Sequence, residues 1–149
     1  MMQLKQPYAD SLPYWKTSNI SAESWIDKAK EELRRANGKI VTEMFASAEG
    51  KEGYMLTFSF GEDVFSIQWP VLKPSSSKEA DKKSAKVQAA TMLYHDIKAR
   101  CVSARVLGIR SAFMGYLLMA NGQTADQVSN ADYMMMIPKV LMLGTGDNK

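Results

Sequence analysis

Lysines crowd one short stretch in the middle of the chain, and amines at that density are suited to binding phosphate. They fall at the start of a predicted helix, where free backbone N–H groups also favour anions. Two further basic residues follow on a polar face of the same helix. A solvated helix face that only keeps a protein soluble has a similar pattern. The predicted nucleic-acid-binding residues are Lys78, Lys82, Lys83, Lys86, Lys98 and Arg105.

Groups for catalysis or metal binding are sparse. The one histidine, His95, and the one cysteine, Cys101, lie on different faces of the predicted helix, so they form neither a Cys/His dyad nor a zinc cluster. Asp96 follows His95, but adjacent residues diverge on a helix and do not form a relay. No GxGxxG or GxxxxGK[ST] phosphate loop occurs. We therefore expect a non-enzymatic protein with no catalytic residues, no metal and no cofactor.

Length and charge indicate one small domain with an uneven charge distribution. The 149 residues, 46% of them hydrophobic, suffice for one core. We predict an N-terminal arm over residues 1–20 and a single α+β domain over 21–149. A net charge of +3 is too small by itself to indicate a polyanionic partner. Residues 73–110, however, carry nine basic and three acidic side chains, so an anion would bind there.

Cysteine content and hydropathy favour a cytoplasmic location. A single cysteine cannot form an internal disulfide, which favours a reducing compartment, and Cys101 is expected to be a small buried hydrophobe. No apolar run approaches the roughly 18 residues needed to span a bilayer. The first ten residues lack the apolar region of a signal peptide. We expect no membrane partner.

The elements that would position the lysines follow from periodicity and turn signals. Ser21 is the predicted N-cap of a first helix over 22–36, which Asn37 and Gly38 end. Three antiparallel strands in a meander are predicted from turn residues and short connections. In the third strand, Val64, Ser66 and Gln68 alternate with Phe65, Ile67 and Trp69, the pattern of a half-buried strand. The predicted strands cover residues 39–48, 54–60 and 64–71.

A long basic amphipathic helix is predicted after the polar linker 74–77. It begins between Lys78 and Ser84 and ends near Gly108. One face is apolar, and the other carries Ser84, Thr91, His95, Lys98 and Arg105. The apolar face comprises Ala90, Leu93, Ile97, Cys101 and Ala104.

A short helical and apolar C-terminal region completes the predicted α+β fold. It comprises an apolar segment over 111–119, a short helix from Ala125, and a Met-rich tail. Because an exposed apolar tail is unfavourable in water, we expect it to pack on the core or on another subunit. Packing on another subunit would give a homo-oligomer. Most of the aromatic residues are expected in the core. Tyr54, Trp69 and Tyr94 would stack on bases only if they faced the lysines.

This order of elements resembles two nucleic-acid-binding families. The segment SAKVQAATMLYHDIKARCVSARVLG, after three strands, is similar to the helix that follows the β-β-β core of single-strand annealing proteins of phage and eukaryotic recombination. The resemblance covers roughly residues 39–108. The double-stranded RNA-binding domain has α-β-β-β-α order, and its second helix begins with a motif similar to KKSAKVQAA. That resemblance implies phosphate contacts at Lys82, Lys83 and Lys86.

Departures from the two patterns rank the alternatives. The long helix and the apolar region after it exceed what a double-stranded RNA-binding domain needs, and that family's glycine-proline and histidine loop elements are missing. We therefore favour binding and annealing of single-stranded DNA in recombination or phage replication, with duplex RNA as the alternative. A non-enzymatic protein-interaction module that uses the Met-rich tail (Met134, Met135, Met136 and Met142) is the third alternative.

Overall fold

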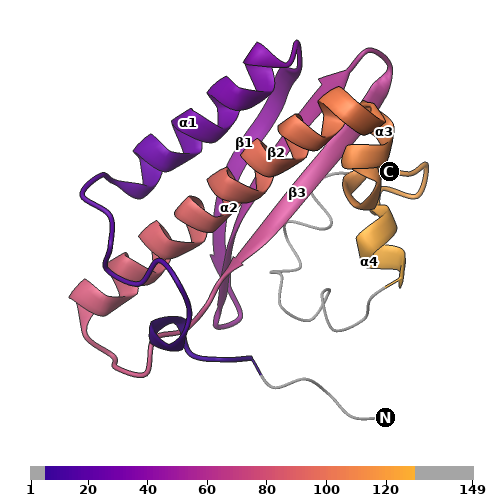
Figure 1. The fold of residues 1–149 in the computed structure, drawn as a ribbon. Helices are drawn as coiled ribbons and strands as arrows, with labels where there is room; N and C mark the ends of the chain where they lie inside the picture. Colours follow the sequence, from indigo (N-terminus) through magenta and orange to yellow (C-terminus); the bar gives the residue numbers. More distant parts are fainter. Residues whose placement is uncertain (1–5, 130–149) are drawn as a thin grey trace.

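A computed structural model of the chain describes residues 6–129. It confirms the predicted α+β class: two helices and a three-stranded antiparallel sheet alternate in the order α1-β1-β2-β3-α2, followed by short helical segments (Figure 1). The Met-rich tail, on which the predicted oligomer and the interaction module depend, lies outside the described residues.

Helix α1 (Ala22–Arg35) begins and ends as its flanking residues predict. The Oγ of Ser21 accepts a hydrogen bond from the backbone N–H of Ser24 at 3.1 Å, as an N-cap does. At the other end, the N–H of Gly38 donates to the carbonyl of Leu33 at 2.8 Å, which closes the last turn.

The sheet is the predicted meander, with the first strand as expected and the second and third beginning earlier than expected. Strands β1 (Lys39–Ala48), β2 (Lys51–Phe60) and β3 (Asp63–Val71) pair in sequence order. Glu49 and Gly50 both have positive φ, 57° and 75°, as a two-residue hairpin turn of type I′ requires. The β1–β2 hairpin therefore ends in a tight tip, and β1 is an edge strand with no fully buried residue.

Helix α2 (Glu79–Leu107) is 29 residues long and ends at Gly108, whose φ of 90° breaks the helix. Its expected division into an apolar and a polar face is wrong in the central turns. Thr91, predicted on the polar face, is 2% exposed, and Gln88 is 1% exposed. Both are buried because the central turns of α2 pack against other segments on several sides.

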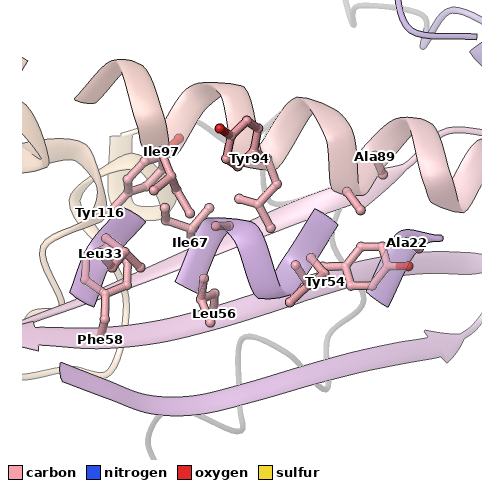
Figure 2. Packing of buried hydrophobic residues seen from close by; sticks show 14 of the residues in the cluster. Ala22, Leu33, Tyr54, Leu56, Phe58, Ile67, Ala89, Tyr94, Ile97 and Tyr116 are labelled. Carbon is pink, nitrogen blue, oxygen red and sulfur yellow. The ribbon is translucent and has the colours of Figure 1, made fainter. Parts of the chain in front are cut away.

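The two long helices lie parallel on one face of the sheet (Figure 1). The ring centres of Trp25 and Tyr94 are 5.2 Å apart. Two helical turns further along both helices, the Cys101 thiol lies 3.8 Å from the carbonyl oxygen of Glu32. Both contacts run in the same chain direction. Figure 2 shows Leu56 and Ile67 of the sheet beneath α2. The fully buried side chains of this core include Leu33, Leu56, Phe58, Phe65, Ile67, Leu93, Ile97 and Phe113.

The opposite face of β3 is also buried, so this strand is not half-buried as predicted. Ser66 is 0% exposed, and its hydroxyl lies 3.1 Å from that of Thr57. Gln68 donates to Ser66 at 3.3 Å and accepts a hydrogen bond from Gln127 of α4 (Ala125–Ser129). These buried polar groups satisfy one another, which is why polar residues occupy this face.

The N-terminal arm is packed against α2 and the β3–α2 linker. It contains a 3-10 turn, η1 (Ala9–Ser11). The Nε2 of Gln88 donates to the carbonyls of Ala9 at 2.7 Å and Pro13 at 3.0 Å, and the N–H and Oγ of Ser75 both donate to the Asp10 carboxylate at 2.8 Å. The arm is therefore ordered by hydrogen bonds to two later segments.

Replacing Gln88 with leucine is expected to loosen the arm. The carbonyl of Pro13 would lose its donor, and that of Ala9 would keep only the hydrogen bond from the N–H of Leu12. Loss of a donor to a buried acceptor costs about 1–3 kcal/mol. Amide hydrogen exchange should rise across residues 6–20 in Gln88→Leu and stay at the wild-type rate in β2. The equally conservative change Gln123→Leu, on a surface loop, is the control. Unchanged exchange in the arm of Gln88→Leu would contradict this assignment.

Acid is expected to release the arm. Hydrogen bonds from Ser75 lower the pKa of Asp10 below its ordinary value of 3.8, and the hydrogen bond from Lys16 lowers that of Asp81. At a pH above 3.8, both carboxylates are ionised and stabilise the docked arm in full. This contribution disappears as the pH falls through the lowered pKa values. Intrinsic tryptophan fluorescence, to which Trp15 of the arm contributes, should report the transition. A double variant, Asp10→Asn with Asp81→Asn, should lose it, and an unaltered transition there would refute the assignment.

Candidate nucleic-acid interface

The first turn of α2 combines exposed lysines with an uncapped helix end. Lys78 is the N-cap residue, and its side chain makes no capping hydrogen bond. Its own N–H donates to the Oγ of Ser76 at 3.0 Å. Lys82 and Lys83 are exposed one turn later. Positive side chains and the positive end of the helix dipole therefore lie together.

A groove opens between this end of α2, the tip of the β1–β2 hairpin and the β3–α2 linker. Its volume is about 460 Å³. Lys82 lines it from the helix and Lys73 from the linker. The amine of Lys73 reaches Gly50 in the hairpin turn, where it would lie 3.8 Å from an added Cβ. We call this site the hairpin groove; it is lined by Ser47, Gly50, Glu52, Val71, Leu72, Lys73, Pro74, Ser75, Ser76, Ser77, Lys82 and Ala85.

Beside the hairpin groove, Lys86 crosses from α2 to the edge strand. Its amine lies 4.9 Å from the centre of the Phe45 ring, a cation–π contact. Phe45 packs on Tyr54 with ring centres 4.9 Å apart, yet 38% of it remains exposed. An exposed ring beside an amine can stack on a base while the amine binds phosphate.

Lys83 points to a different site. With Lys16 it lines a second groove of about 310 Å³, between α2 and residues 18–21 of the arm. Lys16 itself pairs with Asp81 at 2.7 Å. Lys82 and Lys83 are adjacent in sequence, so on a helix they diverge by about 100° and serve separate surfaces.

Lys98 and Arg105 lie far from the hairpin groove. At 1.5 Å per residue they are about 24 Å and 35 Å from Lys82 along the helix. Lys98 lies over Tyr94, 5.9 Å from its ring centre, and Arg105 is exposed in the last turn. The structure therefore brings Lys82 and Lys86 to one end of α2, beside Lys78, and does not unite all six predicted residues.

Acidic groups reduce the positive charge near the hairpin groove. Lys82 pairs with Glu79 at 3.4 Å, but Glu79 is 90% exposed, and such a surface pair is worth little. Glu52 lines the groove and accepts a hydrogen bond from Ser47 at 3.3 Å. No ion pair within residues 6–129 involves Lys73, Lys78 or Lys86.

Two of the three aromatic residues that sequence offered for stacking are buried. Tyr54 and Tyr94 are each 8% exposed, and burial raises the pKa of Tyr54 to about 12. Trp69 is partly buried against the core. Phe45, which sequence did not single out, is the ring beside the lysines. From sequence alone, a phenylalanine in a strand is predicted to be buried. Only the packing of the helices on the sheet shows that this edge position stays partly exposed.

Cys101 is only partly buried against the core, less than the buried hydrophobe expected, and His95 is exposed on the polar face where the sequence puts it. Burial raises the pKa of the Cys101 thiol to about 11, so it stays protonated at neutral pH. Asp96 makes no relay with His95, because its carboxylate binds Arg100 at 2.9 Å and Tyr116 at 3.0 Å. Within the described residues, no three His, Cys, Asp or Glu side chains are grouped to hold a metal ion.

No protein-family model, curated protein or solved structure matches the chain. In the part of the chain that the structure describes, no helix is both long enough and apolar enough to span a membrane.

Proposed function

We propose that this protein binds single-stranded nucleic acid, with single-stranded DNA favoured, at the start of α2. The observation that carries the proposal is an open groove lined by Lys73 and Lys82, with the cation–π pair of Lys86 and the partly exposed Phe45 ring beside it. Amines would neutralise phosphates, and the ring would stack on an unpaired base. Catalytic chemistry forms no part of the proposal.

The size of the hairpin groove favours a single strand. A volume of about 460 Å³ is that of a small-ligand site, large enough for part of one strand. A duplex would lie only across its rim, with its bases paired and inaccessible to Phe45.

Strand annealing in recombination or phage replication is the process we propose for this binding. It is supported by the resemblance of residues 84–108 to the helix of single-strand annealing proteins. An annealing assay tests it. Two complementary strands, one carrying a fluorophore and the other a quencher, should pair faster with the protein than without it.

Duplex RNA is the second candidate. The α1-β1-β2-β3-α2 order, with KKSAK near the start of α2, fits the double-stranded RNA-binding pattern that the sequence resembles. A duplex would be bound through its phosphates and 2′-hydroxyls, largely by shape. The same lysines serve both candidates, so competition between ligands must separate them.

Fluorescence anisotropy with labelled single-stranded DNA, duplex DNA and duplex RNA tests the proposal. We expect the tightest binding to single-stranded DNA, weakening steeply from 50 to 200 mM salt because counterions are released. Glu52→Gln should tighten binding, since it removes a negative charge from the groove. Preference for duplex RNA would favour the second candidate, and no binding to any of the three would refute the proposal.

A further inference from the structure

Four aromatic rings gather around the outer surface of the helix pair, away from the hairpin groove. Tyr14 of the arm lies flat on His95 of α2, with ring centres 5.0 Å apart and planes 13° apart. Trp25 of α1 lies 5.8 Å from His95 and 5.2 Å from Tyr94. We call these the ring cluster: Tyr14, Trp25, Tyr94 and His95.

The outer members of the ring cluster remain open to solvent. Tyr14 is 37% exposed although one face of its ring lies on the imidazole, and His95 is exposed as well. Tyr94 is buried and forms the floor. A planar ligand could therefore reach the cluster only at Tyr14 and His95.

The arm holds Tyr14 at a backbone cost. Its φ is 70°, in the left-handed region that residues other than glycine seldom adopt. Trp25 is fixed too, because its Nε1 donates to the Oγ of Ser18 at 2.8 Å. Gln88 ties Pro13, next to Tyr14, to α2 at 3.0 Å. The rings are thus positioned before any ligand arrives.

Two lysines flank the same rings. The amine of Lys28 lies 5.4 Å from the centre of Trp25 and 5.8 Å from that of Tyr94, and the amine of Lys98 lies 5.9 Å from Tyr94. Neither lysine forms an ion pair with any residue between 6 and 129. These amines lie over the more buried rings of the cluster, next to the exposed Tyr14 and His95. Positive charge without an ion-pair partner near an exposed ring suits a nucleotide, which offers both a phosphate and a planar base.

We infer that the ring cluster is a second contact for the same single strand, in which an unpaired base stacks on the face of Tyr14 that His95 leaves open, while Lys28 and Lys98 bind phosphates. The inference rests on the proposed function. Lys86 and Lys98 are about 18 Å apart along α2, a span that a site of roughly 4–16 nucleotides covers. Because a stacked base must be unpaired, the ring cluster would select single strands over duplexes.

Oligothymidine and an abasic strand of equal length test the inference on the full chain. Tyr14→Ala should weaken binding of oligothymidine about tenfold, the loss of one stacked base, and leave binding of the abasic strand unchanged. Tyr14→Phe keeps a ring and should bind like the wild type. Tyr8→Ala removes another exposed tyrosine of the arm and is the matched control.

A second variant guards against a simple loosening of the arm. His95→Ala changes an exposed helix residue and should show the same selective loss. Equal losses on both strands in Tyr14→Ala and His95→Ala, or no loss on either strand, would overturn the ring cluster as a contact. The proposed function would stand in that case if the double variant Lys82→Glu with Lys86→Glu still binds much more weakly than the wild type. Failure of the wild type to bind oligothymidine would overturn both.

Discussion

Reversing two charges, Lys82→Glu with Lys86→Glu, is expected to weaken binding of single-stranded DNA roughly 100-fold at low salt. The two amines lie on the side of α2 that faces the hairpin groove and Phe45. Their loss should also lower the slope of log affinity against log salt by about 1.4, since each phosphate contact on a single strand contributes about 0.7. Anisotropy titrations at several salt concentrations measure both quantities.

The matched control reverses two charges far from the groove. Arg105 lies in the last turn of α2, and Lys39 begins β1; both are exposed. Lys39→Glu with Arg105→Glu changes the net charge by the same amount, so a general electrostatic effect would weaken binding equally in both double variants. We expect a loss of less than about fivefold here, because only long-range attraction changes. Equal losses of affinity in the two double variants would show that the hairpin groove is not the binding site.

Truncating Phe58 to alanine is expected to cost about 3–5 kcal/mol of stability. Phe58 is 0% exposed and contacts the rings of Phe60, Phe65 and Phe113, with centres 5.4–5.9 Å apart. The substitution leaves a large cavity between the sheet and the segment after α2. Urea unfolding followed by circular dichroism gives the free energy of unfolding.

Phe58→Leu is the graded control for that substitution. It keeps most of the apolar volume, so we expect a loss of under about 1.5 kcal/mol. Phe45→Ala, on the exposed edge strand, should cost less than Phe58→Ala because Phe45 is 38% exposed. A loss in Phe45→Ala as large as that in Phe58→Ala would show that Phe45 is a core residue and is not available to a ligand.

Local signals predicted the elements well because each rests on adjacent residues. Ser21 caps α1, Gly108 ends α2, and the glycine-containing turns separate the strands. These features depend on φ preferences and on side-chain hydrogen bonds within a few residues. They needed no knowledge of tertiary packing.

Sequence failed where burial depends on segments distant in the chain. Thr91 and Gln88 are polar, yet they are buried because α1 and the arm pack around the middle of α2. Ser66 and Gln68 are buried because a segment more than 50 residues later supplies Gln127. No period within a single element encodes these contacts.

The candidate site was predicted only in part. The density of lysines in the sequence predicts a basic site at the start of α2. In the structure, however, Lys83 faces the arm, and Lys98 and Arg105 lie much further along α2. The sequence does not predict Lys73 and Phe45 as site residues. They lie near α2 only because the sheet places the β1–β2 hairpin and the β3–α2 linker beside that helix. Only the fold brings these groups together.

Photocrosslinking of a single strand that carries 5-iodouracil tests the central claim most directly. If the strand lies in the hairpin groove with a base against Phe45, the crosslinked peptide should contain Phe45, and excess unlabelled single-stranded DNA should compete the crosslink away. Crosslinks that form only at sites remote from the hairpin and the start of α2, with a strand that binds tightly, would contradict the account.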